Sequence, residues 1–391
     1  MPYFQYITNK GEYINMKILR KISVIAIVFS LLLSGCGSKN KEHKYLDFSN
    51  EFFTQYCDLS VSPSDGGYYY AVNGYMYYMD TDKNSIVPVC SKVDCTHNSS
   101  TCDAYIGRTG IWFGSIQYYD GSLYVTSDLM NSGDDIGVNV ERNLIKMSVD
   151  GTRKEKIMKI NSDFSGILHR GYVYYIEDVY NSGDSVCTLY QQDLSDLKAA
   201  PKELYKTNSK LDIAGVYGDM IYFNVSGGSD DGYYAVNLTD YKVYKKEFVQ
   251  DATNFFFGSV VDNKIYYRYK FNDDNDDKRN CQVYMSDLNF ENEEKVFELS
   301  NPHNRVGYDG KYFYEDNYMD RAVYADKSET RKMIIYDKDF NKVDVVDLGD
   351  TGSYLNGYGD DKYLFVRTDD HIFYFRKSQI GTGSIKVEQL I

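Results

Sequence analysis

The chain has 391 residues, of which 57 are acidic and 43 basic, so its formal net charge at pH 7 is −14. A surface this negative repels phosphate backbones, and we expect no nucleic-acid partner. The 41 tyrosines and 20 phenylalanines, set against only five prolines, favour half-buried pleated strands.

The first 35 residues have the composition of an export leader. Residues 1–15 are polar and aromatic, and we interpret them as an upstream extension with Met16 as the start. Three basic residues then precede an apolar run at 22–33. That run is short for a helix that must cross a hydrocarbon core of ~30 Å. We therefore predict a signal peptide over residues 16–35.

The leader ends in Leu33-Ser34-Gly35-Cys36, which resembles the lipobox of bacterial lipoproteins. The resemblance implies cleavage before Cys36, attachment of a diacylglycerol to its thiol and acylation of the new amino group. Two or more acyl chains anchor a protein stably, whereas one chain does not. We expect a lipid-anchored protein on the extracytoplasmic face of the cell membrane, with an ordinary signal peptide or an uncleaved anchor as the alternative.

The segment that follows the leader is a predicted tether. Residues 36–50 are polar and charged, and they contain too little apolar surface to fold alone. The folded region is then expected over 51–391. It exceeds the usual size of a single hydrophobic core, which a repeat architecture permits.

A short pattern recurs seven times in this region. Each copy has a tight turn rich in Asp, Gly or Asn, followed by a strand with aromatic residues at its centre. The second turn residues are spaced by 44 to 55 residues, at positions 66, 121, 171, 219, 263, 310 and 361. Glycine, asparagine and aspartate tolerate the positive φ of two-residue hairpin turns, so each copy predicts a hairpin.

A second hairpin follows each copy, and its first strand ends in a small acidic or amide residue. These residues are Asp80, Asp150, Asp193, Asn237, Asp287 and Asp337. Such side chains hydrogen-bond the backbone of the turn that follows them. The seventh copy departs from the pattern, because Arg376 stands at this position. Each unit is thus predicted to have four strands.

Four strands per unit at this period predict an all-β fold, a β-propeller of four-stranded antiparallel blades. The count predicts seven blades. Six or eight remain open, because the first unit has a weak opening strand somewhere in 52–61 and the last unit could share strands with it. We expect almost no helix after the signal peptide, and a monomer.

The Asp-Gly-x-x-Tyr-Tyr and Tyr-Tyr-Met-Asp phrases resemble the low-density-lipoprotein-receptor-like propellers of Gram-positive surface lipoproteins. The resemblance covers roughly residues 55–391. It implies a propeller architecture and says little about activity, because propellers carry unrelated functions.

The densest group of soft metal ligands lies between the first two units, in an insertion expected at 90–110. Cys90, Cys95, His97 and Cys102 offer three thiols and one imidazole, a set that suits tetrahedral zinc. The spacing is unusual for zinc, and the alternative is a disulfide-stapled loop, because an exported protein meets an oxidising environment. The resemblance implies that such an insertion is a family feature.

The other cysteines allow further pairings. One bridge within the insertion leaves an odd thiol, which could join Cys57. Cys187 and Cys281 fall in predicted strands far apart in sequence, and we expect them to be buried free thiols.

Few residues suggest catalysis. His43 belongs to the tether and His97 to the cysteine cluster, and we expect His169, His303 and His371 in loops or turns. No metalloprotease helix, serine nucleophile elbow or phosphate-binding glycine loop is present.

Acidic runs occur at 134–135, 230–231 and 272–277, and we expect solvated loop charges there. The run at 272–277 lacks the glycine and the terminal glutamate of a calcium loop. The single tryptophan, Trp112, is expected to be buried between blades more readily than to stack on a ligand.

These observations favour a non-enzymatic, membrane-anchored propeller that binds a protein or glycan, with a passive scaffold as a related reading. The alternative is a propeller hydrolase or lyase that acts on glycans through carboxylates in the central funnel. The expected cofactor is none, apart from structural zinc at the cysteine cluster.

Overall fold

A computed structural model of the chain describes residues 61–64, 66–107, 116–127, 142–160, 166–181, 184–247, 249, 252–271, 280–299, 305–316, 331–349, 357–367 and 371–390. The chain divides into two units, 1–44 and 45–391, and all described residues belong to the second. No helix within the described ranges is long and apolar enough to cross a membrane. The predicted signal peptide, Cys36 and the tether lie outside these ranges.

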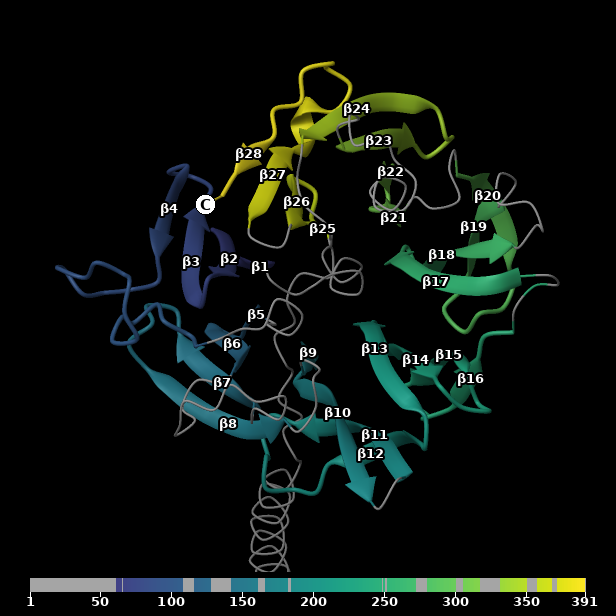
Figure 1. Cartoon of the computed structure of the whole chain (residues 1–391), viewed down its shortest axis with the longest axis horizontal. Helices are drawn as coiled ribbons and strands as arrows, with labels where there is room; N and C mark the ends of the chain where they lie inside the picture. The colour runs from purple at the N-terminus through teal and green to yellow at the C-terminus, as the bar shows by residue number, and fades with distance from the viewer. Residues whose placement is uncertain are drawn as a thin grey trace, which may run out of the picture. The chain divides into compact units, whose positions relative to one another are not determined.

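The described residues form 28 strands in seven sheets of four strands each, arranged around a centre as a seven-bladed β-propeller (Figure 1). In every sheet the strands are antiparallel and follow one another in sequence order. The first strand of each blade lies nearest the centre and the fourth lies outermost (Figure 1). The predicted all-β fold with seven blades is confirmed.

The first four blades have the following strands. Blade 1 contains β1 (Val61–Ser64), β2 (Gly67–Val72), β3 (Tyr75–Asp80) and β4 (Ser85–Pro88). Blade 2 contains β5 (Ile116–Tyr119), β6 (Ser122–Ser127), β7 (Arg142–Ser148) and β8 (Lys154–Ile160). Blade 3 contains β9 (Ile167–His169), β10 (Tyr172–Asn181), β11 (Asp184–Asp193) and β12 (Lys202–Thr207). Blade 4 contains β13 (Lys210–Tyr217), β14 (Met220–Ser226), β15 (Gly232–Asn237) and β16 (Val243–Lys245).

The last three blades repeat the arrangement. Blade 5 contains β17 (Ala252–Val261), β18 (Lys264–Phe271), β19 (Asn280–Asp287) and β20 (Glu294–Glu298). Blade 6 contains β21 (Arg305–Tyr308), β22 (Tyr312–Asp316), β23 (Arg331–Asp337) and β24 (Lys342–Gly349). Blade 7 contains β25 (Gly357–Gly359), β26 (Tyr363–Arg367), β27 (Ile372–Arg376), the 3-10 helix η4 (Lys377–Gln379) and β28 (Glu388–Gln389).

The two ends of the propeller meet without exchanging a strand. Blade 1 is built from β1 to β4 and blade 7 from β25 to β28, so within the described residues neither sheet borrows a strand from the other. The opening strand β1 begins at Val61, later than most of the expected range 52–61. Its place is fixed by the hairpin register, in which Ser64 pairs with Gly67 directly across the turn.

Turn chemistry explains why the seven copies begin as hairpins. In blades 2, 3 and 5 both central turn residues have positive φ, as at Asp120 (45°) and Gly121 (71°). This is the backbone shape of the tight turn whose twist matches the flanking strands. Asp262 and Asn263 adopt it in blade 5 at 50° and 60° without a glycine, because short polar side chains tolerate it.

The acidic or amide residue at the end of each third strand closes the second hairpin. Asp80 Oδ1 accepts hydrogen bonds from the backbone N–H of Asp82 (3.1 Å) and Lys83 (2.9 Å). Asp337 Oδ1 does the same for the N–H of Asp339 and Asn341, each at 2.9 Å. Asp150, Asp193 and Asn237 likewise accept backbone N–H groups of the turns that follow them, whereas Asp287 accepts the side chains of Lys264 and Asn292. The predicted role is therefore confirmed at five of the six positions.

The aromatic positions of the repeat form the core between blades. One buried cluster joins each adjacent pair of blades from 1 to 5, and a larger one runs through blades 5, 6, 7 and 1. The residue four places after each second turn residue is buried in all seven copies: Tyr70, Val125, Tyr175, Phe223, Tyr267, Tyr314 and Phe365. Burial of these side chains against neighbouring blades is what stabilises the ring.

Polar side chains on the innermost strands also link neighbouring blades. Ser62 Oγ accepts the N–H of Tyr118 at 2.8 Å, which ties blade 1 to blade 2. Gln117 accepts the N–H of Leu168 at 2.7 Å and ties blade 2 to blade 3. In blade 5, Ser259 Oγ accepts the N–H of Tyr308 at 3.0 Å. Ser62, Gln117 and Ser259 all stand four residues before the second turn residue, so this link belongs to the repeat.

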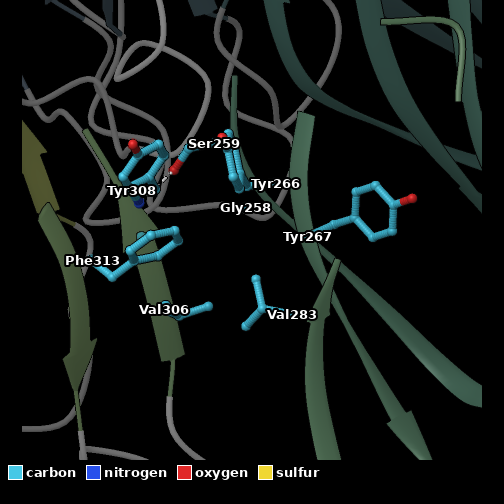
Figure 2. A pocket seen from close by; sticks show the side chains of 9 residues that line it. Gly258, Ser259, Tyr266, Tyr267, Val283, Val306, Tyr308 and Phe313 are labelled. Atoms are coloured by element: carbon cyan, nitrogen blue, oxygen red, sulfur yellow. Dashed lines mark hydrogen bonds between the residues drawn. The ribbon is translucent and has the colours of Figure 1, made fainter. Parts of the chain in front are cut away.

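A small void remains between blades 5 and 6 (Figure 2). Its volume is about 10 Å³. The apolar side chains of Val283, Val306 and Phe313 line it, together with Gly258 and Gly307. Packing is thus slightly incomplete where two glycines lie on facing innermost strands.

Candidate metal centre and ligand cleft

The cysteine insertion interrupts the outermost strand of blade 1. Strand β4 pairs with β3, and just beyond β4 the N–H of Val89 still donates to Met76 O at 2.9 Å. It then leaves the sheet and rejoins it at Tyr105, which bridges to Tyr75 in the same antiparallel sense. Residues 90–104 are therefore an excursion from the edge of the sheet, shorter than the expected insertion at 90–110.

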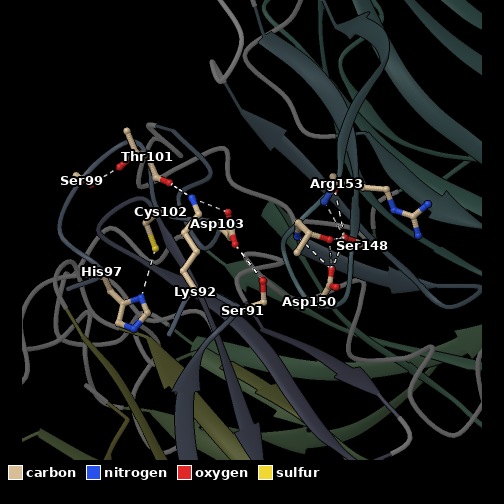
Figure 3. A network of polar contacts seen from close by, with 11 residues as sticks. Ser91, Lys92, His97, Ser99, Thr101, Cys102, Asp103, Ser148, Asp150 and Arg153 are labelled. Carbon is tan, nitrogen blue, oxygen red and sulfur yellow. Dashed lines mark hydrogen bonds and ion pairs between the residues drawn. The ribbon is translucent and has the colours of Figure 1, made fainter. Parts of the chain in front are cut away.

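The excursion brings all four predicted ligands together. One side-chain ligand atom from each of Cys90, Cys95, His97 and Cys102 can be chosen so that all lie within 4.8 Å of one another. His97 Nδ1 lies 3.4 Å from Cys102 Sγ (Figure 3). His97 has a positive φ of 54°, which turns the chain back toward the cysteines.

Polar contacts hold the base of this loop (Figure 3). Lys92 Nζ lies 2.9 Å from Asp103 Oδ1 and also donates to the carbonyl of Thr101. The Lys92 ammonium lowers the pKa of the Asp103 carboxyl. Ser91 Oγ donates to the same carboxylate at 3.2 Å. The loop thus closes on itself across its two ends.

The thiols differ in their protonation behaviour. Burial raises the pKa of Cys102 to about 11. Burial also acts to raise the pKa of Cys90, but hydrogen bonds from the backbone at Lys92 and Asp103 outweigh it and lower this pKa. Cys102 is the most enclosed of the four ligands, with 2 % of its surface exposed.

The described cysteines carry free thiols. Cys90, Cys95 and Cys102 are unbridged, and Cys187 is buried on β11 as a free thiol, as predicted. Cys57 lies outside the described residues, so its predicted pairing stays a prediction. Cys281 falls on β19.

A polar cleft lies at the junction of blades 6 and 7. Its volume is about 660 Å³. The β21–β22 turn, the β25–β26 turn and the end of β27 supply its walls, because these connections all leave the same end of their sheets. The lining residues are Asp309, Lys311, Tyr312, Asp360, Asp361, Lys362, Tyr363, Arg376, Lys377 and Ser378.

Two of the cleft carboxylates are occupied in holding the fold. Asp309 Oδ2 accepts Lys377 Nζ at 2.6 Å, and both side chains are buried. Asp309 Oδ1 accepts the N–H of Lys311 and Tyr312. Asp360 accepts the hydroxyl of Tyr68 from blade 1, so the cleft floor is also the seam that closes the ring.

Arg376 gives the cleft its most distinctive side chain. It stands where five other blades carry Asp or Asn and blade 2 carries Ser148, and its Nη2 donates to Asn84 Oδ1 of blade 1 at 3.0 Å. The guanidinium lies 5.6 Å from the centre of the Tyr363 ring. In the seventh repeat, a cation that lines the cleft therefore takes the place of the side chain that caps the turn in other repeats.

The described histidines outside the cysteine loop are His169 and His371, and both make structural contacts. His169 is buried in β9, and its Nε2 lies 2.7 Å from Gly218 O of blade 4. Burial lowers its pKa to about 4. His371 is exposed before β27 and stacks on Phe373. His303 lies outside the described residues.

One carboxylate pair sits across blades 3 and 4. Asp178 on β10 and Asp212 on β13 interact electrostatically, and burial, then Asp178, raises the pKa of Asp212 against the lowering effect of Lys210. Asp178 Oδ1 is buried and finds no hydrogen-bond partner among the described residues. Cys187 lies opposite Asp178 in the sheet.

The remaining predicted residues fall into two groups. Asp230 is not a simple solvated charge, because it accepts the hydroxyls of Thr207 (2.7 Å) and Ser209 (2.6 Å). Trp112, 134–135 and 272–277 lie outside the described residues. The spacing of the repeat did not predict the cleft cations Lys311 and Lys362, which stand in its turns.

Comparisons with known proteins show the fold. No protein-family model and no curated protein matches the sequence. Among solved structures, a prolyl endopeptidase matches with a TM-score of 0.56 at 12% identity, covering 88% of this chain and 52% of that chain. An acylaminoacyl peptidase matches with a TM-score of 0.50 at 9% identity, covering 87% and 53%.

A third match is the β-propeller domain of the Trilobed protease from Pyrococcus furiosus, with a TM-score of 0.47, 9% identity and coverage of 85% and 96%. The chain spans about half the length of the two peptidases it matches. At these identities the likeness concerns the propeller alone.

Proposed function

We propose that the chain is an extracytoplasmic lipoprotein, anchored through Cys36, whose propeller binds an acidic glycan without transforming it. The observation that carries the binding role is the cleft between blades 6 and 7. It combines cationic, carboxylate and tyrosine side chains in a space of about 660 Å³, a volume typical of small-molecule and oligosaccharide-sized sites.

The charge of the cleft selects the ligand class. Four basic and three acidic side chains line it, whereas the whole chain carries 43 basic and 57 acidic residues. Asp309 is neutralised by Lys377 inside the fold. With that pair set aside, three cations, Lys311, Lys362 and Arg376, and two carboxylates, Asp360 and Asp361, remain in the lining. A carboxylate or phosphate on a sugar is attracted there, and an arginine can bind it through two parallel hydrogen bonds.

One tyrosine of the cleft suits a sugar ring. Tyr312 is half-buried beneath Lys311, whose ammonium lies 4.9 Å from the ring centre. Tyr363 is buried beneath Arg376, with 5% of its surface exposed. Aromatic faces pack against the C–H face of a sugar, while nearby carboxylates accept its hydroxyl protons. This combination favours a glycan over a flat apolar protein surface.

The test measures binding of the full chain, purified from membranes, to uronic-acid oligosaccharides and to neutral oligosaccharides of equal length. We expect binding of the acidic series alone, and loss of at least about tenfold in affinity for Arg376→Asp, because that change reverses a charge in the cleft. Arg153→Asp is the matched control, since Arg153 is exposed in the β7–β8 turn of blade 2 and the net charge changes equally.

Several results would contradict the proposal. Equal losses in Arg376→Asp and Arg153→Asp would mean that overall charge, and not the cleft, governs binding. Binding of neutral sugars alone, or of neither series, would remove the acidic-glycan role. A mature amino-terminal peptide without lipid on Cys36, seen by mass spectrometry, would remove the anchor.

The same assay decides the alternative of a glycan hydrolase or lyase. The observation that favours it is the Asp178–Asp212 pair, in which one carboxyl is held toward its neutral form, as general acids are. Shortening of the oligosaccharides during the assay, abolished by Asp212→Asn, would replace the binding role by catalysis.

A further inference from the structure

We propose that Cys90, Cys95, His97 and Cys102 hold one structural zinc ion, which fixes the excursion at the outer edge of blade 1. This site is independent of the glycan cleft, which lies across blades 6 and 7.

The geometry is the first support. Zinc binds thiolate sulfur at about 2.3 Å and imidazole nitrogen at about 2.0 Å, so ligand atoms around a tetrahedral ion lie about 3.5 to 3.8 Å apart. The four ligand atoms here already lie within 4.8 Å of one another. The His97–Cys102 contact, at 3.4 Å, has the tetrahedral spacing. Metal entry therefore requires only small side-chain movements.

The burial pattern of the loop is the second support. In residues 90–103 only five side chains are not exposed, and they are the four ligands and Asp103. Every other residue of this stretch faces solvent, and Val93 is 96% exposed. The loop turns its cysteines and its histidine away from solvent and leaves its valine exposed. Its conformation is therefore organised around these four ligands.

The loop has no other centre of order. Its buried side chains are Cys102 and Ala104, and Ala104 already lies where the chain rejoins the sheet, because its carbonyl accepts the N–H of Met76 at 2.8 Å. The stretch before Ala104 therefore has no apolar core of its own. Its backbone hydrogen bonds are isolated turns, such as Cys102 N–H to Ser99 O at 3.0 Å. Ordering each residue of a loop costs about 1–2 kcal/mol in backbone entropy. A metal bound by four side chains offsets that cost, as it does in small zinc domains.

Local charge fits the same ion. Three thiolates and one neutral imidazole around Zn²⁺ leave a net charge of −1. Lys92 and Lys154 both interact electrostatically with Cys90, and Lys154 also with Cys102. These two lysines therefore balance the remaining negative charge of the zinc site within a chain that is acidic as a whole.

Four protein ligands complete the coordination, so the ion has no open position for a substrate and its role is structural. The loop base is pressed against blade 2, where Gly151 (φ 79°) passes so close that a Cβ there would lie 2.3 Å from Val89 O and 2.9 Å from Asp103 O. The ion therefore also fixes the outer junction of blades 1 and 2. A disulfide would use two of the four ligands and leave the others without a role.

The test is the zinc content of the full chain purified with its thiols kept reduced. We expect about one equivalent for the wild type, and less than a tenth for Cys95→Ser and for His97→Ala. Cys187→Ser, which changes a buried cysteine of blade 3, is the matched control and should keep its zinc. Co²⁺ exchanged into the wild type should give intense tetrahedral d–d bands and thiolate-to-metal charge transfer.

Hydrogen exchange measures the structural role independently of the variants. Removal of the metal by a chelator should raise exchange at 90–107 by at least about tenfold and leave β9–β28 unchanged. Zinc retained by Cys95→Ser, octahedral cobalt spectra or less than a tenth of an equivalent in the wild type would overturn the proposal. So would a disulfide among these cysteines in the protein as isolated from the cell, detected by mass spectrometry after alkylation of its free thiols.

Discussion

The buried side chain of His169 makes the stability of the folded chain depend on pH. It is buried at the junction of blades 3 and 4, beside Gly218 O, with Arg170 bound to Asp219 next to it at 2.7 Å. Burial is the largest cause of its lowered pKa, and the positive charge of Arg170 adds to it. Folding therefore favours the neutral ring.

This histidine predicts acid sensitivity. Its pKa is about 4 in the folded chain and near 6.5 when unfolded. Between these values the unfolded chain binds more protons, so the free energy of unfolding falls as pH drops from about 6.5 to about 4, by up to about 3 kcal/mol. Urea unfolding at pH 7, 5 and 4 should show a flatter pH dependence in His169→Gln. His371→Gln, at an exposed site, is the control and should behave as wild type; identical profiles for all three would refute the assignment.

The spacing of the cysteines predicted that Cys90, Cys95, His97 and Cys102 come together, whereas the cleft escaped prediction. Cys90 to Cys102 lie within thirteen residues, and such a short loop keeps its side chains close to one another whatever the fold around it. The cleft joins Lys311 and Lys362 from two turns with Arg376 at the end of β27. Their proximity follows from the packing of blade 6 on blade 7, which sequence order does not contain. The one sequence signal for the cleft was Arg376, which stands at a repeat position where most other repeats carry aspartate or asparagine.

Among the strands, the repeat made most of the fold predictable. Two-residue turns with Gly, Asn or Asp fix hairpin register, so seven turns located seven sheets. The opening strand β1 starts at Val61, the last residue of the expected range, and residues 52–60 lie outside the described part of the chain, so the rest of that range stays a prediction. The cross-blade links of Ser62, Gln117 and Ser259 also went unnoticed, since polar residues inside a strand normally indicate a solvent-facing position.

Two glycines on facing strands predict opposite responses to alanine. At Gly307 a Cβ would meet no atom within 4 Å, and this residue lines the void between blades 5 and 6. Gly307→Ala should raise the free energy of unfolding by about 0.5–1 kcal/mol, because it restricts the unfolded chain and adds contacts.

Gly258→Ala is the matched comparison. A Cβ there would lie 2.4 Å from the carbonyl oxygen of Tyr266. Overlap with backbone cannot relax through a rotamer change, so we expect a loss of about 1–3 kcal/mol. Denaturant unfolding measures the stability of both variants. A gain in stability for Gly258→Ala would contradict the prediction, because it would mean that the innermost strands can shift to accommodate the added Cβ.

For the ring as a whole, closure depends on side chains. Among the described residues blades 1 and 7 exchange no strand. Their seam is held by hydrogen bonds from Tyr68 to Asp360 and from Arg376 to Asn84, and by aromatic packing. The Tyr68 ring lies 4.8 Å from that of Phe365 and 5.5 Å from that of Tyr363.

Two of the three tyrosines of β2, Tyr68 and Tyr70, test this seam. Tyr68→Phe removes the donor to Asp360 Oδ2 and should cost about 1–3 kcal/mol of stability. The hydroxyl of Tyr70 is buried without a hydrogen-bond partner among the described residues, so Tyr70→Phe should be neutral or slightly stabilising. Thermal unfolding compares them, and equal losses in both variants would mean that the hydroxyl of Tyr68 does not hold the seam.

The sequential order of strands in each sheet has a consequence for how the chain is made. Each of the 28 described strands pairs only with its neighbours in sequence, so a blade can form as soon as its own stretch has been synthesised. Docking of blade 7 onto blade 1 is then the final step of assembly. Until it happens, the apolar flank of blade 1 has no partner, and the nascent protein is most prone to associate with other copies just before its last fifty or so residues emerge.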